Sequence, residues 1–106
     1  MKKFVSIELD KTRNLRYGIN ALCQMEEMLG KSVTKLQEEI GIKEFRIMLY
    51  CGLVWEDNTI TLEKVGNLMD EAISDKGIEY INGKVSEALE LALGVKKRKS
   101  RRRNKL

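Results

Sequence analysis

The feature that most constrains the fold is the stretch of residues 43–56, which reads KEFRIMLYCGLVWE. It contains no proline, only one glycine, and apolar or aromatic residues on every side of a helical wheel. Charge is confined to Arg46 and to the residues at the two ends. A helix that is apolar all round has to be buried. The sequence therefore predicts a central helix enclosed by the rest of the chain, with Trp55 among the residues that complete its apolar surface.

Gly52 lies inside this predicted helix. Glycine is less favourable than alanine in a helix interior by roughly 1 kcal/mol, so its presence needs a compensating reason. Either the missing side chain lets a neighbouring helix approach closely, or the chain turns or kinks at this point. The sequence leaves both explanations open.

The first 17 residues predict a β-hairpin. Apolar and polar residues alternate over residues 4–9 and again over residues 13–17, and residues 10–12 between them suit a turn. Two strands are only marginally stable by themselves, so the apolar side of the hairpin is expected to lie on helices. A start without regular structure is the alternative.

Four further segments have apolar residues at helical spacing. They begin at Gly18 or Asn20, at Ser32, at Thr59 or Thr61, and at Ile78, and they end at Gly30, at Gly41, at residues 75–77, and at Gly94. The predicted fold class is therefore mainly α, about five helices around a buried central helix with a small N-terminal β-hairpin, or α+β by strict count.

Charge divides the chain into a folded domain over residues 1–94 and a basic tail over residues 95–106. The cations of the tail are Lys96, Lys97, Arg98, Lys99, Arg101, Arg102, Arg103 and Lys105. The tail holds no acid, and residues 1–95 hold 12 basic and 16 acidic residues, a formal charge of −4. We expect the tail to be disordered and to attract polyanions at low salt, without reading a nucleic-acid sequence because it lacks aromatic residues.

Catalytic and metal-binding patterns are missing from the sequence. The chain has no histidine and no glycine-rich phosphate-binding motif. Neighbouring carboxylates such as Glu26 and Glu27 point about 100° apart on a helix and do not converge on one substrate atom. An enzyme, a cofactor and a metal site are therefore not expected. Cys23 and Cys51 fall on apolar helix faces and are expected to be two buried free thiols.

Membrane insertion is not expected either. No apolar run approaches the roughly 20 residues that span a bilayer, and the first ten residues lack the apolar centre of a signal peptide. The sequence predicts a cytoplasmic location without a membrane partner.

The order of several short motifs resembles the tail assembly chaperones of long-tailed (siphovirus-type) phages and prophages. The resemblance covers residues 15–92 and rests on LRYGINALCQMEEMLG, on the central helix ending in GLVWED, and on TLEKVGNLMDEA. None of these motifs is as specific as a catalytic signature, and the basic tail departs from the family pattern.

The resemblance implies a non-enzymatic, helical protein that binds the tape measure protein, keeps that long helical rod soluble, and leaves as the tail tube polymerises around it. Self-association into homo-oligomers is implied, as is contact with the tail tube protein. Such a chaperone acts in the bacterial host cytoplasm and is not expected in the mature virion.

The predicted contact surface consists of Met25, Glu26, Glu27 and Met28 on the first helix. Methionines can form an adaptable apolar surface, but more often they fill a core. The runner-up function is a small nucleic-acid-binding or regulatory protein that uses its basic tail. Binding through the tail would weaken steeply as salt rises, whereas binding through an apolar groove would persist.

Overall fold

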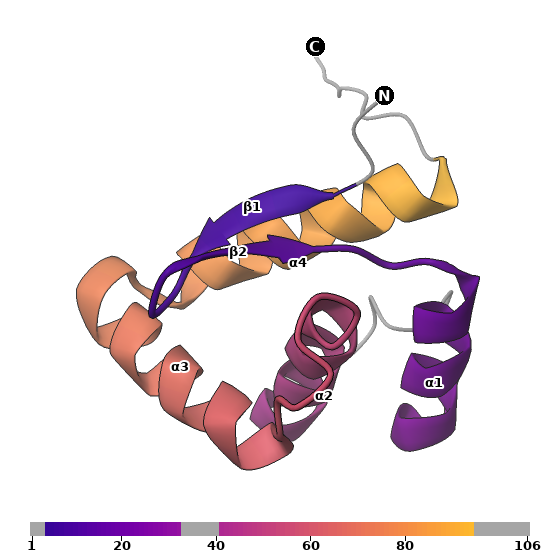
Figure 1. Cartoon of the computed structure of the whole chain (residues 1–106), viewed down its shortest axis with the longest axis horizontal. Coiled ribbons are helices and arrows are strands. Elements are labelled where there is room, and N and C mark those ends of the chain that lie inside the picture. The colour runs from indigo at the N-terminus through magenta and orange to yellow at the C-terminus, as the bar shows by residue number, and fades with distance from the viewer. Residues whose placement is uncertain (1–3, 33–40, 95–106) are drawn as a thin grey trace, which may run out of the picture.

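The computed structural model describes residues 4–32 and 41–94, and its elements follow the order ββαααα (Figure 1). These elements are β1 (Val5–Glu8), β2 (Thr12–Leu15), α1 (Ile19–Leu29), α2 (Ile42–Leu53), α3 (Leu62–Lys76) and α4 (Ile78–Leu93). The prediction of a mainly helical α+β fold with an N-terminal hairpin is confirmed. The described residues form four helices rather than about five, because the expected short second helix falls mostly on residues 33–40, which lie outside the described part.

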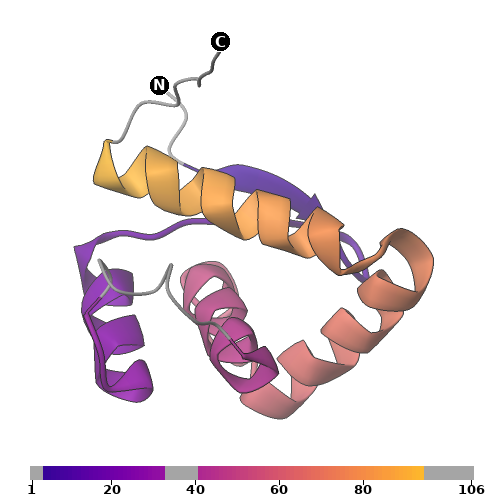
Figure 2. The same ribbon diagram turned by 180° about the vertical axis from the view of Figure 1, so that it is seen from behind.

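The hairpin lies on helices, as predicted. Strands β1 and β2 pair antiparallel, with Val5 opposite Leu15 and Ile7 opposite Arg13. Val5, Ile7 and Leu15 are buried, and helix α4 lies along the hairpin in both views (Figures 1 and 2). The alternation of the strand sequence thus places one face against the helices and leaves the other toward solvent.

Helix α2 is the central helix. It packs against β2, α1, α3 and α4. Its buried residues are Phe45, Ile47, Met48, Leu49, Cys51, Gly52 and Leu53. The helix stops at Leu53, so Trp55 does not complete the buried surface as predicted. Trp55 is 42% exposed and donates its indole N–H to the Asn14 carbonyl at 2.8 Å, because the turn after α2 directs it over β2.

Gly52 permits a close approach, but the neighbour is the hairpin rather than a helix. A Cβ atom at this position would lie 2.8 Å from Leu15 Cδ2 and 2.8 Å from Tyr17 Cζ and Oη. Hydrogen bonds hold the two segments together: Arg16 N–H donates to the Gly52 carbonyl at 3.0 Å, and the Tyr17 hydroxyl donates to the Met48 carbonyl at 2.6 Å. The predicted helix partner at Gly52 was therefore wrong.

Local signals set the helix ends. Gly30 and Gly94 adopt the left-handed conformation that ends α1 and α4, and the Thr61 hydroxyl accepts a hydrogen bond from Lys64 N–H at 3.1 Å at the start of α3. Gly77 has φ +87° and connects α3 directly to α4, so the chain reverses within one residue.

Candidate partner-binding groove

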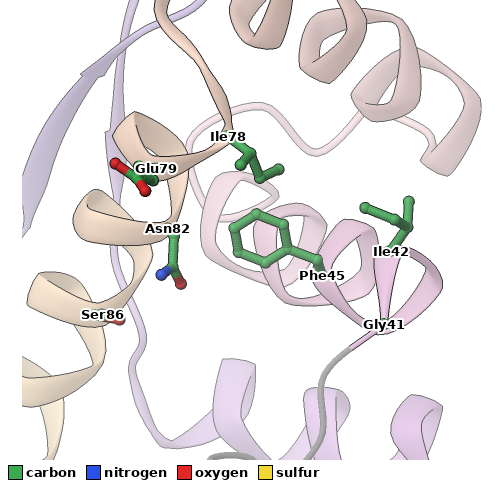
Figure 3. A pocket seen from close by; sticks show the side chains of 7 residues that line it. All are labelled: Gly41, Ile42, Phe45, Ile78, Glu79, Asn82 and Ser86. Atoms are coloured by element: carbon green, nitrogen blue, oxygen red, sulfur yellow. The ribbon is translucent and has the colours of Figure 1, made fainter.

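An apolar groove of about 440 Å³ lies between the start of α2 and the first half of α4 (Figure 3). Its lining residues are Gly41, Ile42, Phe45, Ile78, Glu79, Asn82 and Ser86. The two walls come from distant parts of the sequence and meet because α3 returns the chain across α2.

Three apolar side chains form the centre of the groove. The ring of Phe45 is buried and points from α2 toward α4 (Figure 3). Ile42 and Ile78 flank it and are 67% and 37% exposed. Apolar area removed from water contributes roughly 25 cal/mol per Å², so covering these two isoleucines would favour the binding of an apolar partner.

Backbone geometry at two helix starts fixes the isoleucines. The Glu44 carboxylate accepts a hydrogen bond from Gly41 N–H at 3.1 Å and holds the first turn of α2. Ile42 is the first residue of that turn. Ile78 is the first residue of α4 and follows the sharp turn at Gly77. Both side chains therefore project from the first turn of a helix.

The α4 wall carries the polar groups of the groove. Glu79, Asn82 and Ser86 are spaced three and four residues apart and share one helix face. All three are exposed, and among the described residues that line the groove only Glu79 is charged. No hydrogen bond or ion pair joins these side chains to another residue of the described ranges. The groove thus combines an apolar floor with polar groups available to a partner.

The four residues of the predicted contact surface on α1 do not all lie at the surface. Met25 is fully buried, whereas Glu26 and Glu27 are exposed and Met28 is 36% exposed. The helical spacing turns Met25 inward beside Leu22, so Met25 fills the core and was wrongly assigned to a surface. A binding role for Glu26, Glu27 and Met28 stays a prediction. The tail, residues 95–106, lies outside the described residues.

The two cysteines differ in environment. Cys51 is buried, its Sγ lies 3.9 Å from Met28 Sδ, and burial raises its pKa to about 11. Cys23 is exposed, so the prediction of two buried thiols was wrong for this residue. It lies on the outer side of α1 together with Ile19, which no other helix of the described chain covers.

A second exposed cluster lies on the outer face of the hairpin. The rings of Phe4 and Trp55 stack with their centroids 6.4 Å apart, and the Arg16 guanidinium lies 5.5 Å from the Trp55 ring centroid. Asn14 and Glu56 lie next to these rings and bond to each other. The backbone N–H and the side-chain amide of Asn14 both donate to the Glu56 carboxylate, at 3.1 and 2.8 Å. The cluster therefore serves to fasten β2 to the end of α2.

Ion pairs fix the tip of the hairpin. Arg13 is only 5% exposed and donates to both carboxylate oxygens of Asp10, at 2.7 and 3.0 Å, and to Asp57 at 3.4 Å. The hydrogen bond and the charge of Arg13 lower the pKa of Asp10 to about 2. These bonds connect the hairpin to the loop after α2, and the charge of Arg13 is paired with the carboxylates of Asp10 and Asp57.

Sequence reasoning missed the groove. An apolar residue directly after a helix-starting glycine occurs at Ile42 and Ile78, but also at Ile19, which does not line the groove, so this pattern does not distinguish the groove residues. Over residues 4–32 and 41–94, no group of three His, Cys, Asp or Glu residues is placed to hold a metal ion. In the same ranges, none of the helices is both long and apolar enough to cross a bilayer.

The chain matches no protein-family model, and neither the curated proteins nor the solved structures include a significant match to it. Its fold is that of a small α+β domain with an exposed apolar groove between α2 and α4.

Proposed function

We propose that this protein is a tail assembly chaperone of a long-tailed phage or prophage, and that it binds helical segments of the tape measure protein. The observation that carries the proposal is the groove between α2 and α4, with Phe45 at its floor and Ile42 and Ile78 exposed beside it. Grooves of this kind receive the apolar face of an amphipathic helix.

The size of the groove suits reversible binding. A few exposed apolar side chains supply only a small binding free energy, so each contact is weak by itself. Many copies bound along one rod, and bound to one another, would still hold it strongly through multivalency. Weak individual contacts would also let the chaperone leave when the tail tube polymerises around the rod.

The proposal includes the partners and location implied by the family resemblance. The protein acts without catalysis and without a cofactor, forms homo-oligomers, and meets the tail tube protein during assembly. It works in the cytoplasm of the bacterial host and is absent from the mature virion.

A co-purification experiment tests the proposal. The protein encoded by the long reading frame downstream of this gene is captured on the full chain at low and at high salt. Ile42→Asp places a charge at the groove, and Ile19→Asp is its matched control. Ile42 and Ile19 are each the first residue of a helix after a glycine, they are 67% and 74% exposed, and Ile19 does not line the groove.

We expect the wild type and Ile19→Asp to retain the partner at high salt, and Ile42→Asp to lose most of it. Equal retention by the two variants would remove the groove from the proposal. Retention of nucleic acid alone, and only at low salt, would replace the chaperone with the tail-based function.

A further inference from the structure

The charge and shape of the groove restrict what kind of helix it can receive. We propose that its partner is an amphipathic helix whose apolar stripe is flanked by lysine or arginine, with one cation placed beside Glu79. This inference rests on the proposed function in one respect, the use of the groove as the docking site.

Glu79 gives the groove its negative character. Its carboxylate is exposed at the edge of the α4 wall (Figure 3) and pairs with no cation of residues 4–32 and 41–94. The lysines nearest to it in sequence are engaged elsewhere: Lys76 and Lys84 lie 5.6 and 5.8 Å from the centroid of the Tyr80 ring. Lys43 is exposed beside Ile42 but does not line the groove. A partner cation would thus meet an unpaired carboxylate.

The α4 wall has only short side chains beyond Glu79. Its next lining residues are Asn82 and Ser86. The separation of two packed helices, about 8–10 Å, depends on the side chains at the contact. Small side chains let a partner helix lie close to α4, where Asn82 and Ser86 can bond to its polar groups. The partner therefore needs small or polar residues on the side that faces this wall.

The net charge of the chain does not select the partner. Residues 1–95 carry a formal charge of −4, but the eight cations of the tail bring the whole chain to +4, so the preference for a cation rests on the local carboxylate of Glu79. Apolar contact with Phe45, Ile42 and Ile78 would provide affinity, and Glu79 would select the flank and the orientation of the bound helix.

Two synthetic peptides test the inference. Each is about 18 residues long, or about five helical turns, and both share one leucine stripe on an alanine and glutamine background. One peptide has lysines along the edges of the stripe, and the other has glutamates. Their affinities for the full chain are measured by fluorescence anisotropy with the wild type, Glu79→Gln, Glu87→Gln and Ile42→Asp. Glu87 is the matched control because it is another exposed acid of α4 that does not line the groove.

We expect Glu79→Gln to weaken the lysine peptide by about two- to fivefold, the range of an exposed ion pair, and not to weaken the glutamate peptide. Glu87→Gln should change the ratio of the two affinities by much less. The basic tail is the same in every variant, so its contribution cancels when variants are compared with one peptide.

The measurements distinguish a failure of the charge preference from a failure of the proposed function. If Ile42→Asp weakens both peptides but Glu79→Gln changes neither, the charge preference is overturned and the groove stands. If Ile42→Asp leaves the binding of both peptides unchanged, the groove is not a docking site and the proposed function loses its support. If neither peptide binds, the inference of a simple amphipathic helix is overturned.

Discussion

Replacing Gly52 by alanine tests the packing between the central helix and the hairpin. The new Cβ would lie 2.8 Å from the Leu15 methyl group and from the outer end of the Tyr17 ring. Leu15 can rotate, but Tyr17 is buried and its hydroxyl is hydrogen-bonded to the Met48 carbonyl at 2.6 Å. Relief of the clash therefore requires the ring to move and that bond to lengthen.

The expected net effect of Gly52→Ala is destabilisation by about 1–3 kcal/mol. Overpacking a core costs about 1–3 kcal/mol, and weakening the hydroxyl bond adds about 1 kcal/mol. The higher helix propensity of alanine offsets about 1 kcal/mol of this cost. The sign thus depends on the tertiary contact, because propensity by itself favours alanine.

Gly83→Ala is the matched control. Gly83 is also inside a helix, but a Cβ there would meet no atom within 4 Å. Alanine should stabilise the free protein by about 0.5–1 kcal/mol. Urea unfolding, followed by the fluorescence of the single tryptophan, measures both free energies. If Gly52→Ala were as stable as Gly83→Ala, the close approach of the hairpin to Gly52 would be refuted.

Two further predictions concern ionisable groups. Arg13 lowers the pKa of Asp10 in the folded protein to about 2. The pair therefore adds to the free energy of unfolding above the ordinary aspartate pKa near 3.8, and this stabilisation is lost as the pH falls toward 2. Urea titrations across this interval should show that Arg13→Met loses less stability on acidification than the wild type, by about 1 kcal/mol after solvent screening; equal losses would contradict the pairing. Cys23 should react with a thiol reagent in the folded protein, whereas Cys51, buried and with its pKa raised to about 11, should react only after unfolding. Mass spectrometry with and without denaturant counts the labels, and two labels in the folded protein would refute the burial of Cys51.

The helices were largely predictable because their signals are local. The helical repeat of apolar residues defined each helix, and glycine or threonine marked its ends: Gly30 and Gly94 stop α1 and α4, and Thr61 starts α3. The hairpin followed from alternation and a polar turn. These patterns involve residues only a few positions apart, so they can be recognised in a single sequence.

Several environments could not be predicted from such patterns. The apolar spacing of α1 marked Met25 and Cys23 together, but only Met25 is buried, and Trp55 lies exposed over β2. Periodicity shows that a helix has an apolar side. It does not show how far that side is covered, because coverage depends on which element packs there.

The sequence by itself determined the fold class, the burial of the central helix and the position of the eight clustered cations after residue 95. The tertiary structure decided the groove, because Ile42 and Ile78 come together only when the sharp turn at Gly77 returns α4 to the start of α2. It also decided that the hairpin, and not a helix, packs against Gly52. Both are contacts through space between distant residues, and no local pattern in the chain records which distant residues will meet.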